Sequence, residues 1–290
     1  MSILEEIKYR FNYGNAIIRI ILVNVLVFLM ISIFQLISFL FQLDFGISLI
    51  NWFSLPASFS RLLFQPWSII TYMFLHSGLF HLIFNMLWLY WLGELFQQYL
   101  GNSKTYQAYF LGGIFGGLIY MVAYNVFPAF SNRVMFEMAL GASAGVLSIV
   151  VATATLLPNY GISLMFLGSI KLKYIAIITV LIDLISIPQG NPGGHIAHLG
   201  GAAFGYFFIK LIYSKSEVPN MLDKTFEFFS NGFKTKPKLK VHHKSNTRVT
   251  TSDYGKPTQG EVDAILDKII KGGYESLTKK EKDILFKAGK

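Results

Sequence analysis

A single serine lies among very small residues in the stretch "ALGASAGVL", residues 139–147. Small residues in a membrane helix usually allow two helices to pack closely. They also leave room for a substrate to approach the hydroxyl group of Ser143. With a histidine as base and nearby hydrogen-bond donors, this serine could act as the nucleophile of an acyl-transfer reaction.

The stretch "HSGLFHLIFN", residues 76–85, contains candidate hydrogen-bond donors. His81 and Asn85 lie four residues apart, so a helix would place them on one face. From there both side chains could stabilise a developing oxyanion. The alternative is helix packing, because His and Asn side chains also form hydrogen bonds between membrane helices. His76, near the outer end of the same helix, is a secondary candidate.

The stretch "GGHIAHLGGAAFG", residues 193–205, offers two histidines as the base. His198, Gly201 and Gly205 fall on one helical stripe, and the GxxxG pattern allows close approach of two backbones. This spacing would place the imidazole of His198 beside the tightest helix contact. His195 lies one turn away on the same side, and spacing alone leaves both histidines open as the general base.

No carboxylate is obviously placed to orient the base, so the pattern predicts a Ser–His dyad rather than a triad. Asp183, in "VLIDLIS", and Glu94, in "WLGELF", are both expected to have structural roles. A third catalytic position is the alternative for Asp183, because ionisable groups inside a membrane often mark function.

The composition predicts an all-α polytopic membrane protein with a soluble tail. The chain is 53% hydrophobic and 14% charged, whereas soluble domains average about 25% charged residues. It contains no cysteine, which excludes disulfide and thiolate chemistry. The net charge of +9 is concentrated after Lys215, which favours contact with an anionic membrane surface over nucleic acid.

Several apolar segments are candidates for spanning helices, each of which needs about 20 residues. The aromatic-rich segment 42–75 is expected to be a partly embedded loop at the membrane interface. The distribution of Lys and Arg around the spans places both chain ends in the cytoplasm. The six candidate spans are Ile17–Phe41, Leu79–Leu100, Tyr106–Phe127, Gly141–Leu157, Lys173–Ile187 and Gly194–Tyr213.

The fourth candidate span is short, and this places Ser143 below the membrane surface. At 1.5 Å per residue the span is about 25 Å long, whereas the hydrocarbon core is about 30 Å thick. Ser143 is then expected at a sunken helix N-terminus, where unpaired backbone N–H groups and the helix dipole favour negative charge.

The expected domains are a cytoplasmic segment (1–16), a six-helix membrane domain (17–214), a basic flexible linker (215–258) and a small helical module (259–290). Apolar residues recur at helical spacing between Val262 and Ile270, and Thr278 with Glu281 fits a capping box for a second helix. Two short helices bury little surface, so the module is expected to dock on a partner or to self-associate.

In combination and in this order, "HSGLFHLIFN", "GASAG" and "HLGGAAFG" resemble the rhomboid family of intramembrane serine proteases. The resemblance covers about residues 67–213 and implies a bundle of six transmembrane helices with an interfacial loop after the first. It assigns the nucleophile to Ser143 and the general base to His198. It also implies oxyanion stabilisation by His81 and Asn85, and close packing at the site by Gly141, Gly201 and Gly205.

The resemblance implies cleavage of transmembrane protein substrates in the lipid bilayer, with no metal and no cofactor. It also implies an integral protein of a bacterial inner membrane. The chain departs from the family pattern at Ser68, where an Arg commonly follows the loop Trp, and at Leu147, where an aromatic residue is common. The alternative function is that of a catalytically silent rhomboid-like protein that binds membrane clients.

Overall fold

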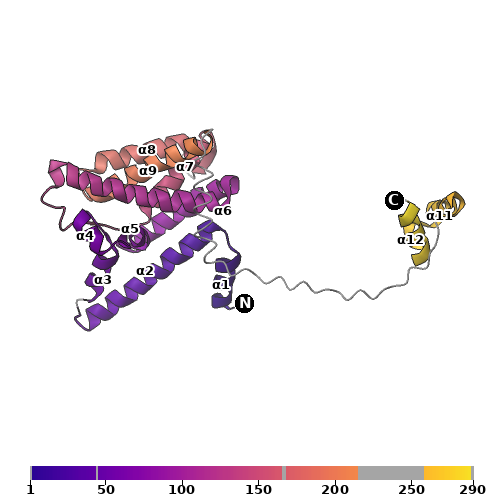
Figure 1. Cartoon of the computed structure of the whole chain (residues 1–290), viewed down its shortest axis with the longest axis horizontal. Helices are drawn as coiled ribbons and strands as arrows, with labels where there is room; N and C mark the ends of the chain where they lie inside the picture. The colour runs from indigo at the N-terminus through magenta and orange to yellow at the C-terminus, as the bar shows by residue number, and fades with distance from the viewer. Residues whose placement is uncertain (1, 44, 165–167, 215–257, 289–290) are drawn as a thin grey trace. The chain divides into compact units, whose positions relative to one another are not determined.

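The computed structural model describes residues 2–43, 45–164, 168–214 and 258–288. The chain divides into two compact units, Met1–Lys234 and Thr235–Lys290. Long helices dominate the first unit, and α7, α8 and α9 lie side by side next to α6 (Figure 1). This architecture agrees with the predicted all-α membrane fold.

The predicted spans correspond to five helices of the first unit. Three described helices, α2, α6 and α9, are long and apolar enough to cross a membrane, and α7 is a shorter apolar helix. The 48-residue α6 loses helical geometry at Gly101 (φ 76°, ψ 176°), so its two halves are the second and third predicted spans. The bounds are α2 Ala16–Leu40, α6 Leu79–Val126, α7 Ser143–Leu156, α8 Leu172–Ser186 and α9 Pro192–Ile212.

The start of α2 is held by polar groups of α6. Helix α1 (Ile3–Tyr13) precedes it, and Asn15 caps α2 by accepting a hydrogen bond from the Ile18 backbone N–H at 2.9 Å. The side-chain amide of Asn15 also donates to Glu94 Oε1 at 2.7 Å. This contact confirms the predicted structural role of Glu94.

The segment predicted as an interfacial loop contains several short helices instead. The side chain of Trp67 anchors it by donating its indole N–H to the Trp52 carbonyl at 3.0 Å, without the Arg that the family pattern has at position 68. The elements are α3 Phe45–Phe53, β1 Leu55–Pro56, α4 Phe59–Phe64, α5 Ser68–Thr71 and the 3₁₀ turn η1 Tyr72–Phe74.

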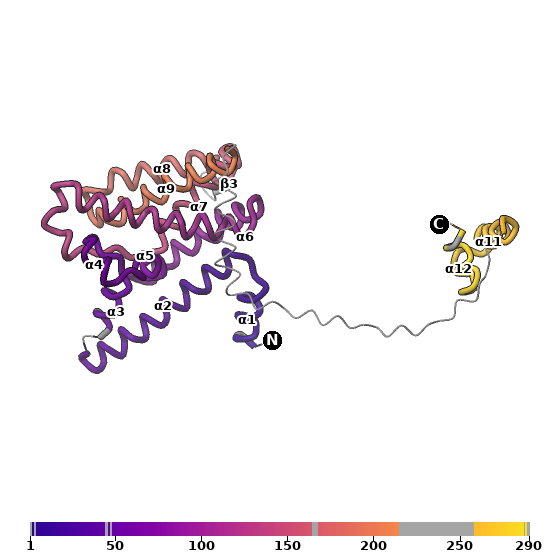
Figure 2. The backbone as a smooth tube through the Cα atoms, in the orientation of Figure 1, coloured from indigo at the N-terminus to yellow at the C-terminus, as the bar shows by residue number. Residues whose placement is uncertain are grey.

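Short strands and turns connect the long helices. After the 3₁₀ turn η2 (Pro128–Phe130), β2 (Met138–Ala139) pairs antiparallel with β1 just before α7. The hairpin of β3 (Gly161–Leu164) and β4 (Gly168–Lys171) joins α7 to α8. Figure 2 shows this hairpin at the end of the bundle where α7 ends and α8 begins.

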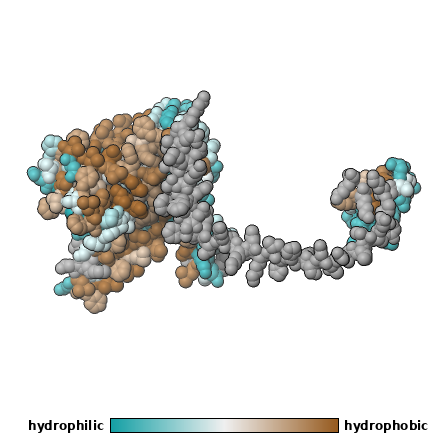
Figure 3. All heavy atoms as spheres, in the orientation of Figure 1, coloured by the Kyte–Doolittle hydropathy of each residue, from teal (hydrophilic) through white to brown (hydrophobic). Residues whose placement is uncertain are grey.

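The outer faces of the first unit carry large hydrophobic side chains. Phe39, Phe207 and Ile185 are 79%, 65% and 61% exposed. Figure 3 shows hydrophobic residues covering most of the visible face of the helical bundle. Soluble monomers rarely expose such an extensive apolar surface, so this surface is suited to lipid.

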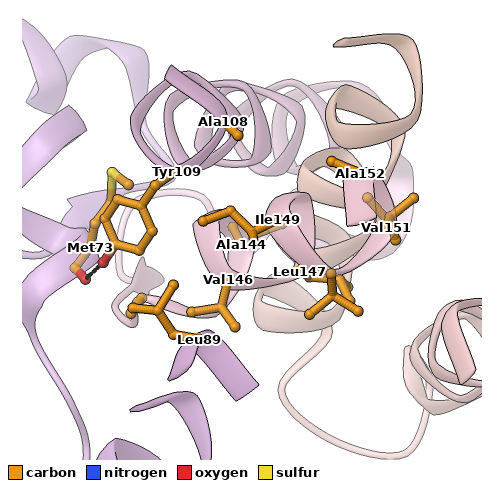
Figure 4. Packing of buried hydrophobic residues seen from close by; sticks show 14 of the residues in the cluster. Met73, Leu89, Ala108, Tyr109, Ala144, Val146, Leu147, Ile149, Val151 and Ala152 are labelled. Carbon is orange, nitrogen blue, oxygen red and sulfur yellow. Dashed lines mark hydrogen bonds between the residues drawn. The ribbon is translucent and has the colours of Figure 1, made fainter. Parts of the chain in front are cut away.

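Helix α7 lies at the centre of the bundle and is almost wholly buried. Ile149 and Ala152 have no exposed surface. Figure 4 shows α7 side chains packed toward Ala108 and Tyr109 on the second half of α6. The Tyr109 hydroxyl donates to the Met73 carbonyl at 3.3 Å, which links this core to the short helices.

Glycines bring α9 into close contact with α7. A Cβ added at Gly201 would lie 2.1 Å from the Ala144 carbonyl oxygen, and one at Gly205 would lie 2.1 Å from the Ser148 carbonyl oxygen. No larger residue fits without moving a backbone. The close helix contact predicted from the GxxxG pattern is therefore present, and it holds the middle of α9 against the first turns of α7.

The second unit consists of α11 (Gln259–Gly272), the turn η3 (Tyr274–Ser276) and α12 (Lys279–Ala288). The predicted capping box is confirmed, because Glu281 accepts from the Thr278 backbone N–H at 2.7 Å and Thr278 Oγ1 accepts from the Glu281 N–H at 3.4 Å. Hydrogen bonds from Lys268 and Thr278 lower the pKa of Glu281 to about 2. Except for Thr258, the predicted linker 215–258 lies outside the described residues.

Candidate active site

Ser143 is the first residue of α7. The turn before it depends on Gly141, whose φ of +135° disfavours residues with a side chain and whose N–H donates to the Tyr72 carbonyl at 2.9 Å. The helix begins two residues later than predicted, so Gly141 belongs to this turn rather than to the span. As the first helical residue, Ser143 has a backbone N–H without an acceptor in its own helix.

The side chains of Ser143 and His198 are in direct contact. His198 Nε2 lies 2.6 Å from Ser143 Oγ, although 55 residues separate them in sequence. The close packing of α9 on α7 explains how the two side chains meet. The geometry therefore favours His198 over His195 as the partner of the serine.

A carboxylate lies next to this histidine, where the sequence analysis expected none to be placed. Asp183, 6% exposed on α8, places Oδ1 at 2.8 Å from Nδ1 of His198 and at 2.8 Å from Nδ1 of His195. An ionised carboxylate only accepts hydrogen bonds, so both imidazoles donate through Nδ1. Neutral His198 then carries its lone pair on Nε2, which faces the Ser143 hydroxyl. The sequence feature that could have indicated this contact is the position of Asp183, a carboxylate within an apolar span.

The same three side chains could also hold a metal ion. The donor atoms of Asp183, His195 and His198 all lie within 4.8 Å of one another. Nitrogen and oxygen donors of this kind suit Zn²⁺. The hydrogen bonds to the Asp183 carboxylate already account for the closeness of these groups.

His81 presents a hydrogen-bond donor beside Ser143. Its Nδ1 lies 3.5 Å from the Ser77 backbone nitrogen and 3.0 Å from Ser77 Oγ. A backbone N–H can only donate, so Nδ1 accepts and the ring proton is on Nε2. A Cβ added at Gly141 would lie 3.2 Å from His81 Nε2 and 3.3 Å from Ser143 Oγ, which puts both groups around this glycine.

Asn85 lies one turn further along α6 and is buried. Its side-chain nitrogen donates to the His81 carbonyl at 2.8 Å, which fixes the amide on the helix. An amide NH₂ group has two hydrogens, so one donor remains for another acceptor.

A cavity of about 370 Å³ joins these groups. Helices α6, α7, α8 and α9 all contribute to its wall. Most of the wall is apolar, with a few convergent polar groups, as is usual for binding sites. The polar side chains that line it are His81, Asn85, Ser143, Thr179, Asp183 and His198.

The other secondary candidate, His76, packs behind this site. It is buried, and its ring lies edge-on to the ring of His81 with centroids 5.1 Å apart. Burial, with a smaller contribution from His81, lowers the pKa of His76 to about 4. Through this ring contact His76 supports the position of the His81 ring.

Comparison with protein families gives two matches. Residues 63–215 match the family described as "Rhomboid domain". Residues 256–287 match a family of unknown function, DUF6576. The first match covers the described active-site residues, and the second covers the C-terminal helices.

Curated relatives share the first region. The chain is 25% identical over 162 residues to Rhomboid protease GlpG of Yersinia pseudotuberculosis, covering 54% of the chain and 52% of that protein. It is 34% identical over 84 residues to GlpG of Serratia proteamaculans, covering 24% of the chain and 30% of that protein. It is also 35% identical over 84 residues to Inactive RHOMBOID-like protein 8 of Arabidopsis thaliana, covering 29% of the chain and 24% of that protein. The chain spans about half or less of the length of these curated relatives.

Proposed function

Because the chain belongs to the rhomboid family, we propose that it is an intramembrane serine endopeptidase that hydrolyses peptide bonds in or near transmembrane segments of membrane proteins. Family membership alone does not carry this proposal, since an inactive rhomboid-like protein is among the relatives. The observation that carries it is the 2.6 Å contact between Ser143 Oγ and His198 Nε2.

In the proposed reaction, Ser143 Oγ attacks the scissile carbonyl carbon while His198 Nε2 takes the hydroxyl proton. The tetrahedral intermediate then collapses, and the protonated His198 gives this proton to the leaving amine. An ester of Ser143 with the new C-terminus remains. Water, deprotonated by the same nitrogen, hydrolyses this ester and restores the serine.

The proposed oxyanion site uses three donors around the first turn of α7. They are the Ser143 backbone N–H, the Nε2–H of His81 and the remaining amide hydrogen of Asn85. Donors fixed in advance stabilise negative charge in a dry site more strongly than water does. The N-terminus of α7 adds a favourable dipole.

Asp183 and His195 act as positioning residues in this proposal. The carboxylate holds the His198 ring with Nε2 toward the serine, and it stabilises the imidazolium that forms during attack. His195 donates to the same oxygen at 2.8 Å and so helps to hold Asp183 in place. Neither residue needs to touch the substrate.

The proposal assigns the chemistry to the membrane domain, residues 17–214, and leaves the module 259–290 outside it. The protein is an integral membrane protein. We further propose a bacterial inner membrane as its location, with both chain ends in the cytoplasm. The excess of Lys and Arg on one side of the predicted topology supports this orientation.

The test is cleavage of a single-span model substrate in proteoliposomes by wild type, Ser143→Ala and His198→Ala. The proposal expects cleavage by the wild type only, with all three proteins folded to the same degree. A serine-directed covalent probe should label the wild type and should not label Ser143→Ala. A wild type that neither cleaves several substrates nor reacts with the probe would favour the client-binding alternative.

A further inference from the structure

A second cavity lies at the opposite end of α7, α8 and α9 from Ser143. Its volume is about 470 Å³. Residues near the end of α7, the start of α8 and the end of α9 form its wall. The wall is apolar over most of its area and includes Val151, Ala154, Ala176, Val180 and Leu181.

Two lysines line this cavity beside the apolar wall. Lys173 is in the first turn of α8 and Lys210 is in the last turn of α9. Their ammonium groups lie near aromatic rings, Lys173 at 5.2 Å from the centroid of Tyr174 and Lys210 at 5.5 Å from that of Tyr206. Within the described residues neither lysine forms an ion pair with a carboxylate.

The first turn of α8 also favours an anion. It contains no acidic side chain, and the helix dipole places partial positive charge there. Lys173 adds a full positive charge at this end, where no side chain of the helix compensates it. An anionic group between Lys173 and Lys210 would therefore be stabilised by both lysines and by the dipole.

We propose that this cavity binds an anionic phospholipid of the surrounding bilayer. The phosphate lies between the two ammonium groups, and an acyl chain lies along the apolar wall. Basic pockets between membrane helices are suited to such headgroups. A soluble phosphate would leave the apolar wall in contact with water, whereas a zwitterionic lipid would leave the lysine charges without a net counter-charge.

The experiment uses the full-length wild type in detergent micelles and native mass spectrometry. Phosphatidylglycerol, phosphatidylcholine and glycerol 3-phosphate are the three probes. The proposal expects phosphatidylglycerol to be retained about 25-fold more strongly than phosphatidylcholine, because each of the two lysines contributes about fivefold near a charged lipid. Glycerol 3-phosphate should neither bind stably nor displace the lipid.

Variants locate the site. Lys173→Gln and Lys210→Gln should each weaken phosphatidylglycerol retention about fivefold. Lys8→Gln on exposed α1 removes the same charge outside the cavity and should leave retention unchanged. Ala176→Trp places a large side chain in the cavity beside the apolar wall, so it should weaken phosphatidylglycerol retention without any change in charge.

Equal retention of the two lipids by wild type would overturn the proposal, and this comparison does not depend on any variant folding. Displacement of phosphatidylglycerol by glycerol 3-phosphate would overturn it too, because the site would then recognise a free phosphate. An equal loss of retention in Lys8→Gln would do so as well, because the attraction would then be diffuse.

Discussion

Helices α7, α8 and α9 line both cavities, one toward each end of these helices. The two cavities differ in whether their ionisable side chains have partners within the protein. At the Ser143 end, every ionisable side chain that lines the cavity contacts another side chain or the backbone. At the other end, Lys173 and Lys210 face the cavity without a carboxylate partner among the described residues. Polar groups at membrane depth must be satisfied by the protein, whereas groups near the interface can be satisfied by lipid headgroups and water.

After loss of Ser143 or His198 themselves, the largest effect is expected where a proposed oxyanion donor is removed. Asn85→Ala should lower kcat on the order of 10²-fold, which is typical of losing one oxyanion donor, while the unfolding temperature changes little. Proteoliposome cleavage and thermal unfolding measure the two quantities. Asn85→Asp keeps the size and removes the donors, so it should be at least as impaired. Full activity in both variants would remove Asn85 from the site.

Loss of the orienting carboxylate should have a slightly smaller effect. Asp183→Ala leaves both Nδ1–H groups without their acceptor and should lower kcat by about 10- to 100-fold, the range expected for a charged hydrogen bond. KM should stay near the wild-type value, because Asp183 positions His198 and does not bind substrate. Asp183→Asn retains an acceptor oxygen and should recover part of kcat. A change confined to KM would contradict the positioning role.

The close contact between α9 and α7 beside Ser143 should be sensitive to a single added methyl group. Gly201→Ala places a Cβ against the Ala144 carbonyl and should lower the free energy of unfolding by about 1–3 kcal/mol. It should also lower cleavage, because α9 carries His198. Gly190→Ala, with no heavy atom within 4 Å of the added Cβ, is the control. Equal stability of the two variants would show that α9 can shift away from α7 at no cost.

The smallest effect is expected at the basic end. Lys173→Gln and Lys210→Gln lie on the far side of the bundle from Ser143, so cleavage in zwitterionic liposomes should stay within about twofold of wild type, as is usual for surface substitutions. Initial cleavage rates measure this. A large loss of activity in these liposomes would show that the two ends do not function separately.

Sequence patterns predicted the spans well because apolar length is a local property. Each of α2, α6, α7, α8 and α9 coincides with an apolar run in the sequence, and α2, α6 and α9 are long enough to cross the hydrocarbon core. The short helices between residues 45 and 74 were not predicted, because brief apolar segments do not distinguish a helix from an embedded loop.

The candidate site was only partly predictable. The small residues around Ser143 and the GxxxG stripe of α9 indicated where two helices meet, and that contact explains the pairing with His198. The role of Asp183 required the structure, because the turn between α8 and α9 decides whether its carboxylate reaches His198 or the lipid. No spacing rule within one helix encodes that turn.

The length of α7 has a consequence for where the proposed reaction would cut a substrate. Its 14 residues span about 21 Å at 1.5 Å per residue, about 9 Å less than the hydrocarbon thickness of about 30 Å. If the C-terminal end of α7 lies at one boundary of the hydrocarbon core, Ser143 lies about 9 Å inside the other boundary. Under the proposed function, a substrate helix that enters from the bilayer should therefore be cleaved about six residues from the end of its apolar segment. Lengthening the apolar segment of the substrate at the end far from the cleavage site should leave the cleavage position unchanged.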